Sequence, residues 1–180
     1  MNLRKVNEEV FIALDPIVKV GREELAFLKR QALENQRKRA RICAHQTNED
    51  SLHEMVIAIS AASYIHPHKH LGKSESFHII EGEVDVVMFD DQGAIVDIIE
   101  LGDAASQRNF YYRLSESAFH TLLIRTDFLV VHEVTNGPFL RDKTVLATFA
   151  PPEERVADAK AYVQQVAARA AQFRSTVRKT

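Results

Sequence analysis

Polar and apolar residues alternate along most of the chain, beginning at Arg39. Between Arg39 and His45, the apolar residues Ala40, Ile42 and Ala44 share one side, which is typical of a half-buried strand. Further strands are predicted at Met55–Ile65, Phe77–Ile80, Glu83–Phe89, Ile95–Leu101, Arg108–Leu114, Phe119–Ile124, Phe128–Val134 and Thr144–Phe149. Many short strands separated by turn residues predict an all-β core, either an antiparallel sandwich or a barrel.

Helical patterns are confined to the two ends of the chain. A short helix is expected from Asn7 to Asp15, and a second one over Arg22–Lys38. After a pair of prolines, Glu153–Phe173 repeats apolar residues every three or four positions. This stripe predicts a helix that packs on the barrel wall or on a partner subunit. We therefore expect one structural domain with an N-terminal helical segment (1–38), a barrel (39–150) and a C-terminal helix (151–180).

Composition and charge narrow the range of function classes. The chain has 180 residues and a net charge of -2, so its charge gives no reason to expect nucleic acid as a partner. Cys43 is its only cysteine, which excludes an intramolecular disulfide and suits a reducing compartment. Neither a signal peptide nor an apolar run of membrane-spanning length is present. We expect a cytoplasmic protein that does not bind membranes.

Four of the eight histidines lie in one stretch, Tyr64–Glu83. His66, His68 and His70 alternate, so an extended strand would point all three to one face. Glu75 follows after a short turn and adds a carboxylate. Imidazole and carboxylate groups are ligands for a divalent transition metal such as Zn(II), Fe(II), Ni(II) or Mn(II), and without a thiolate the set does not suit a structural zinc knot.

The same stretch resembles the first motif of the cupin superfamily, G-x5-H-x-H-x(3,4)-E-x6-G. His68, His70, Glu75 and Gly82 match its spacing, whereas Ala62 replaces the leading glycine. The resemblance implies an antiparallel jelly-roll β-barrel and one metal held by His68, His70, Glu75 and a histidine from a second motif. By its position in A-F-H-T-L-L, His120 is the candidate that the resemblance gives for this fourth ligand, although Ser115-Glu116-Ser117 replaces that motif's Pro-x-Gly and Ile124 its final Asn.

More narrowly, the chain resembles the WbuC family of cupin-fold metalloproteins. The matching pieces are R-A-R-I-C-A-H, Y-I-H-P-H-K-H, K-S-E-S-F-H-I-I-E-G, V-V-M-F-D-D-Q-G, F-Y-Y-R-L and H-E-V-T-N-G-P-F, which span residues 39–139. The family is associated with bacterial O-antigen and surface-polysaccharide gene clusters, without an established reaction. The resemblance implies a metalloprotein of polysaccharide biosynthesis, and cupins commonly form homodimers.

Two histidines of the stretch have competing interpretations. His66 shares the parity of His68 and His70, but it precedes Pro67 and lies outside the motif spacing. If Glu75 points inward, Phe77 and Ile79 share its face, and His78 points away.

Five further residues are candidates for the pocket or for contacts with the metal ligands. Arg41 and His45 lie on the polar side of one strand, where they form either a cationic rim for an anion or ordinary surface. Tyr112 and Arg113 could supply a phenol and a guanidinium to a bound anion, or belong to an amphipathic strand. Glu133 is either a pocket carboxylate or part of a strand end.

These observations support a protein that binds or transforms a small anionic or sugar-derived molecule, with the metal as a Lewis acid. No catalytic residue is assigned. One alternative is a non-catalytic module in which the metal anchors a ligand. Another is a metal-free cupin epimerase of the deoxysugar type, although the complete His-His-Glu set argues against it.

Overall fold

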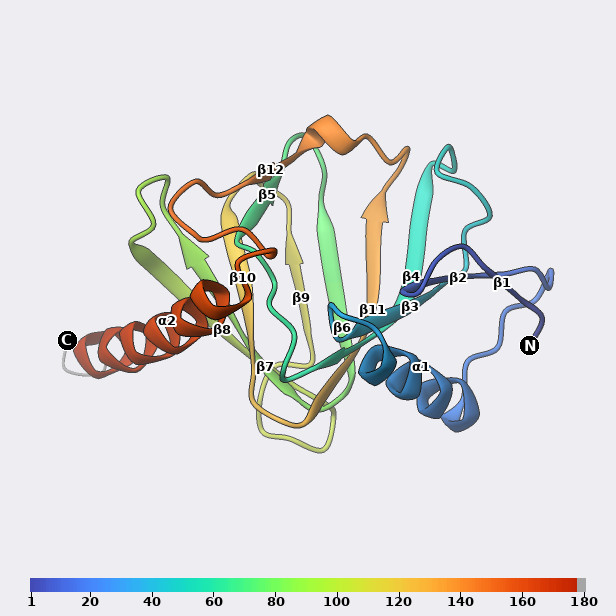
Figure 1. The fold of residues 1–180 in the computed structure, drawn as a ribbon, viewed down its shortest axis with the longest axis horizontal. Helices are drawn as coiled ribbons and strands as arrows, with labels where there is room; N and C mark the ends of the chain where they lie inside the picture. Colours follow the sequence, from blue (N-terminus) through green and yellow to red (C-terminus); the bar gives the residue numbers. More distant parts are fainter. Residues whose placement is uncertain (178–180) are drawn as a thin grey trace.

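The computed structural model describes residues 1–177, which form two β-sheets and two α-helices (Figure 1). The seven-stranded sheet has the order β1 (Leu3–Lys5), β2 (Val10–Ala13), β3 (Arg39–Cys43), β4 (Leu52–Ser60), β11 (Phe128–Asn136), β6 (Glu75–Glu81) and β9 (Tyr111–Leu114). The five-stranded sheet has the order β12 (Thr144–Leu146), β5 (His68–His70), β10 (Phe119–Ile124), β7 (Glu83–Phe89) and β8 (Ile95–Gly102). All strand pairs except β2 with β3 are antiparallel.

The predicted all-β core is confirmed, in the form of two sheets rather than a closed barrel within residues 1–177. The sheets enclose a core to which both contribute, with Ile57, Phe77, Ile79, Leu129 and Val131 from one and Val84, Val86, Met88 and Leu122 from the other. Side chains alternate across each strand, so burying one face fixes the register. The predicted parity of β6 is confirmed, because Phe77 and Ile79 are buried while His78 is exposed.

The helices cover the outer faces of the two sheets. Helix α1 (Arg22–Glu34) packs Leu28 and Ala32 against Ala40 and Ala58 of β3 and β4. Helix α2 (Val156–Val177) packs Val166 and its apolar neighbours on β7 and β10. The stripe of the C-terminal helix therefore packs on the protein's own sheet. Figure 1 shows the two helices on different sides of the molecule.

The prediction of a short helix from Asn7 to Asp15 is wrong. Val10–Ala13 is the strand β2, whose Phe11 and Ala13 are buried, so the first 38 residues are not purely helical. The Asn7 side chain accepts hydrogen bonds from the amides of Glu9 and Val10, at 2.8 and 2.9 Å, and thereby stabilises a turn. The same residue chemistry favours a helix N-cap, which explains the error.

Several predicted boundaries also differ. The strand expected over Met55–Ile65 ends at Ser60, where the amide of Ser63 bonds back to the Ser60 carbonyl. The last predicted strand ends at Leu146, and the second predicted helix ends at Glu34. The final three residues of the predicted 151–180 segment lie outside the described residues. None of the helices among residues 1–177 is long and apolar enough to cross a membrane.

Candidate metal centre

Four side chains from both sheets meet between strands β5, β10 and β6. His68 and His70 lie on β5, His120 on the adjacent strand β10, and Glu75 begins β6 of the opposite sheet. His68 and His120 are direct partners in the antiparallel ladder. One ligand atom from each of the four residues can be chosen so that all lie within 4.8 Å of one another. The structure thus brings together the four residues that the sequence proposed as ligands.

Hydrogen bonds orient all three imidazoles in the same way. Nδ1–H of His68 donates to the His66 carbonyl at 2.8 Å, and Nδ1–H of His120 donates to the Ala118 carbonyl at 3.0 Å. Nδ1 of His70 lies 3.1 Å from Oγ1 of Thr144. A carbonyl can only accept, so neutral His68 and His120 carry a lone pair on Nε2. Such outer hydrogen bonds commonly fix the tautomer of metal-binding histidines.

The carboxylate of Glu75 occupies the middle of the group. Its two oxygens lie 3.4 Å from Nε2 of His70 and 3.5 Å from Nε2 of His120. The hydroxyl of Tyr112 donates to Oε1 of Glu75 at 2.9 Å. Burial by itself would raise the pKa of Glu75, but His120 and His70 outweigh it and hold this pKa well below its usual value.

The histidines respond differently to this environment. Burial, together with His120, lowers the pKa of His68 to about 4, so its imidazole is neutral at neutral pH. Burial also acts to lower the pKa of His120, but the carboxylate of Glu75 outweighs burial and raises that pKa. The group therefore offers an anionic carboxylate and imidazoles that can bind a metal when they are neutral. This donor set fits a divalent transition metal.

Two histidines of the same stretch lie outside this group. The chain before Pro67 is not a strand, so alternation does not extend to His66, which is buried with Nε2 2.9 Å from the Ala147 carbonyl. His78 is exposed on the outer face of β6 and packs edge-to-face on Phe110. The alternation expected for an extended strand therefore does not apply to His66, which lies outside the four-residue group.

The five pocket candidates have different positions. Tyr112 touches Glu75, whereas its neighbour Arg113 is exposed and bonds to Ser74 and Ser115, outside the four-residue group. Glu133 and Arg41 are half-buried on the strands β11 and β3. The ring of His45 stacks on His53, with centroids 4.0 Å apart, and its Nδ1 lies 3.2 Å from the Glu54 carbonyl. Burial and His53 lower the pKa of His45.

Some residues that contact the candidate ligands or the pocket candidates could not be found by residue type alone. Thr144 orients His70, and the hydroxyl of Ser117 donates to the His70 carbonyl at 2.6 Å. Buried His53 lies under the turn at Gly137, where a Cβ atom would come within 2.8 Å of its Nε2. These contacts depend on strand register and turn geometry, for which the sequence contains no local motif.

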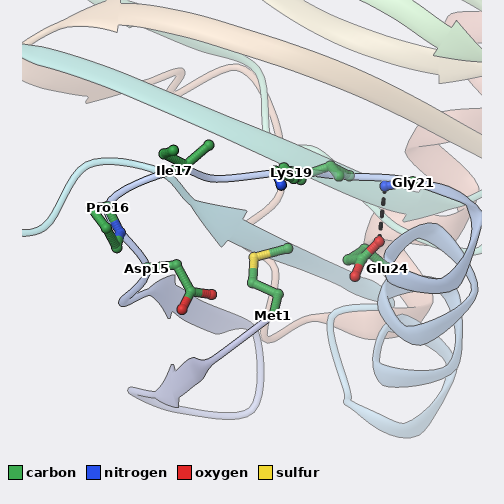
Figure 2. A pocket seen from close by; sticks show the side chains of 8 residues that line it. Met1, Asp15, Pro16, Ile17, Lys19, Gly21 and Glu24 are labelled. Atoms are coloured by element: carbon green, nitrogen blue, oxygen red, sulfur yellow. Dashed lines mark hydrogen bonds between the residues drawn. The ribbon is translucent and has the colours of Figure 1, made fainter.

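Two hollows lie away from the four-residue group. Figure 2 shows one of about 600 Å³ between the N-terminus and the start of α1, lined by Met1, Asp15, Ile17 and Glu24 among others. The Glu24 carboxylate accepts a hydrogen bond from the Gly21 amide at 2.8 Å, so it caps the helix. The other hollow, of about 680 Å³, lies beside the ion pair Lys29–Glu81. Neither contains a group of metal ligands among the described residues.

Comparison with known proteins shows the fold but no activity. A family described as a domain of unknown function (DUF6016) matches residues 20–101, a range that includes His68, His70 and Glu75 but not His120. No curated protein is significantly similar in sequence.

Three solved structures are similar to the structure of this chain. Protein SO0799 from Shewanella oneidensis is 14% identical, with a TM-score of 0.51 over 69% of this chain and 81% of that one. The salicylate 1,2-dioxygenase from Pseudoaminobacter salicylatoxidans, in complex with gentisate, is 13% identical, with a TM-score of 0.52 over 72% of this chain and 37% of that one. The cupin domain of Schizosaccharomyces pombe Cnp3 is 12% identical, with a TM-score of 0.43 over 56% of this chain and 66% of that one. The chain therefore has a fold similar to that of SO0799 and of the dioxygenase, with a group of residues that could hold a metal.

Proposed function

We propose that this protein holds one divalent transition metal with His68, His70, Glu75 and His120 and acts on a small anionic or sugar-derived molecule. The observation that carries this proposal is the convergence of four ligand atoms whose imidazoles are already oriented by hydrogen bonds at Nδ1. A metal bound there would supply Lewis-acid polarisation of a substrate oxygen.

The residues of the chain would keep this site ready for a ligand. Tyr112 holds one oxygen of Glu75, so the carboxylate keeps its orientation. Buried His120 and half-buried His70 approach different oxygens of that carboxylate, and the side chain of His70 is 21% exposed. This partial exposure supports access from solvent on the His70 side.

The wider biological setting is also a proposal. Similarity of residues 39–139 to the WbuC family supports a role in bacterial surface-polysaccharide metabolism, in the cytoplasm. The cupin resemblance supports jelly-roll connectivity of the two sheets and a homodimer. Neither nucleic acid nor a membrane is part of the proposal.

Elemental analysis of purified protein tests the metal assignment. We expect about one transition metal per chain in the wild type, because four donors without a metal would leave imidazoles and a carboxylate partly buried together. His68→Ala should lose that metal and keep a folded circular dichroism spectrum, whereas the control His78→Ala, which changes an exposed histidine, should keep the metal. Wild-type protein without stoichiometric metal would contradict the proposal.

A further inference from the structure

The inner face of the large sheet extends from Glu75 toward two other ionisable residues. In the register of β11 and β6, Thr135 lies opposite Glu75 and Glu133 lies opposite Phe77. Residues two apart on a strand share a face, so Glu133 points to the same side as Glu75. Diagonal neighbours of this kind are about 7–8 Å apart. Glu133 is therefore the next carboxyl group beyond Glu75 on this face.

Arg41 continues the same surface. Met55 of β4 lies opposite both Glu133 of β11 and Cys43 of β3. Arg41 lies two residues before Cys43, on the same face, and its Nη1 reaches to 3.8 Å from Sδ of Met55. Met55 thus separates Glu133 from Arg41, and the surface runs from Glu75 through Glu133 and Met55 to Arg41.

Neither Arg41 nor Glu133 has an oppositely charged partner within 4.0 Å among residues 1–177. By contrast, Arg39 on the same strand as Arg41 is paired with Glu153 at 3.0 Å, and the buried Asp85 is paired with Arg108 at 3.0 Å. The half-buried charge of Arg41 is costly without a partner unless water or a ligand supplies one, and the half-buried carboxyl group of Glu133 likewise needs a hydrogen-bond partner.

We propose that Arg41 and Glu133 bind the ligand of the metal centre, and that this ligand is a hydroxylated organic anion. Its carboxylate or phosphate pairs with Arg41, a hydroxyl group bonds to Glu133, and its other end lies at the four-residue group. This inference rests on the proposed function and names the substrate class of the same site. A guanidinium matches planar or tetrahedral oxyanions, and a carboxyl group bonds to hydroxyls.

Calorimetric titration of the metal-containing protein tests this assignment with four probes. Gluconate and glucose 6-phosphate carry both hydroxyls and an anionic group, whereas acetate and glucose each carry only one of these features. We expect gluconate or glucose 6-phosphate to bind at least about tenfold more tightly than acetate or glucose. Acetate lacks the hydroxyl that would bond to Glu133, and glucose lacks the anionic group that would pair with Arg41. Which of the two anions binds better distinguishes a carboxylate from a phosphate.

Variants of the two residues give the second readout. Arg41→Met should weaken the better anion roughly 10- to 100-fold and Glu133→Leu at least about tenfold, with the metal content of both unchanged. Arg30→Met, which changes an exposed arginine on α1, is the matched control and should bind like the wild type. Arg41→Lys keeps the charge and the aliphatic stem, so it replaces Arg41→Met if that variant does not fold.

Two results would overturn the inference: wild-type affinity in the Arg41 variant, or no binding of either anion to the wild type. Failure of the proposed function is a different result, because it is measured by elemental analysis. Protein that lacks a metal and still binds gluconate through Arg41 would refute the metal centre and retain the anion site.

Discussion

Tyr112 is the residue that connects the candidate metal centre to the rest of the core. Its ring packs edge-to-face on Phe77, with centroids 5.3 Å apart, while its hydroxyl donates to Glu75. Burial and the Glu75 carboxylate raise the pKa of Tyr112 well above its usual value, so the hydroxyl keeps its proton. It therefore acts as a permanent donor that fixes one oxygen of Glu75.

Removing this hydroxyl should weaken metal binding without unfolding the protein. Tyr112→Phe keeps the ring contact with Phe77 and removes only the hydrogen bond to Glu75. Loss of such an outer contact typically weakens metal affinity by roughly 10- to 100-fold. Chelator competition measures the affinity, and Tyr111→Phe, which changes the exposed neighbouring tyrosine, is the control. Equal affinities in the two variants would show that Tyr112 does not orient the ligand.

Glu133 should make the stability of the metal-free protein depend on pH. Burial and the Glu75 carboxylate raise its pKa to about 8, against an ordinary value of 4.5. Between these values the unfolded chain ionises while the folded one holds its proton, so stability falls as pH rises through this range. Below the ordinary pKa, Glu133 is protonated in both the folded and the unfolded state. The free-energy cost of keeping it protonated in the fold is then absent.

Glu133→Gln should remove that cost. We expect it to raise the free energy of unfolding of chelator-treated protein by roughly 1–3 kcal/mol at pH 8, discounted for partial exposure. Near pH 4 the variant and the wild type should be nearly equal. Urea unfolding at the two pH values measures both, and a benefit that is the same at pH 4 and pH 8 would contradict the assigned shift.

At the scale of elements, a buried carboxylate joins the C-terminal helix to the small sheet. Asp85 of β7 is fully buried and pairs with Arg108, Arg125 and Arg174, the last of which lies on α2. Arg174 also reaches the more exposed Glu100 of β8 at 2.9 Å. One carboxylate therefore forms ion pairs with arginines from three parts of the chain.

Asp85→Asn should destabilise the fold strongly, because it leaves partly buried arginines without their shared counter-ion. Removing one partner of a buried ion pair costs roughly 3–5 kcal/mol. Glu100→Gln, which removes only the exposed partner of Arg174, should cost less than about 1 kcal/mol. Denaturant unfolding compares the two, and similar small effects would mean that the Asp85 network contributes little.

The sequence predicts elements well where burial and local chemistry agree. Glu83–Phe89 and Phe119–Ile124 have the predicted bounds because both strands bury most of their residues beside clear turns. The strand Val10–Ala13 could not be predicted, because its partners β1 and β3 are set by tertiary pairing while Asn7 mimics a helix cap.

The same distinction holds for the candidate site. His68, His70 and Glu75 follow a local spacing, and His120 follows from chain order. Thr144 depends on its register opposite His70, which no local pattern specifies. Asp85 lies in an otherwise apolar strand, and its arginine partners become neighbours only after folding. Sequence thus predicts groups defined by spacing better than groups defined by contact.

At the scale of the whole molecule, the apolar stripe of α2 belongs to the monomer core. Val166 is 1% exposed and packs with Val87, Phe89 and Leu123 of the small sheet. The homodimer predicted from the cupin resemblance must therefore use another surface if it forms. Covering the outer face of the small sheet also keeps β7 and β10, and with them His120, in a fixed position.

Val166→Ala should consequently lower the stability of the fold rather than dissociate a complex. Truncating this buried side chain costs roughly 1.5–3 kcal/mol, from lost burial and the cavity it leaves. Val156→Ala on the same helix, where the side chain is 63% exposed, should change stability by less than about 0.5 kcal/mol. If α2 packs only within its own chain, Val166→Ala keeps the oligomeric state of the wild type in analytical ultracentrifugation at every protein concentration. A variant that dissociates at a concentration where the wild type is associated would instead place this stripe in an interface between subunits.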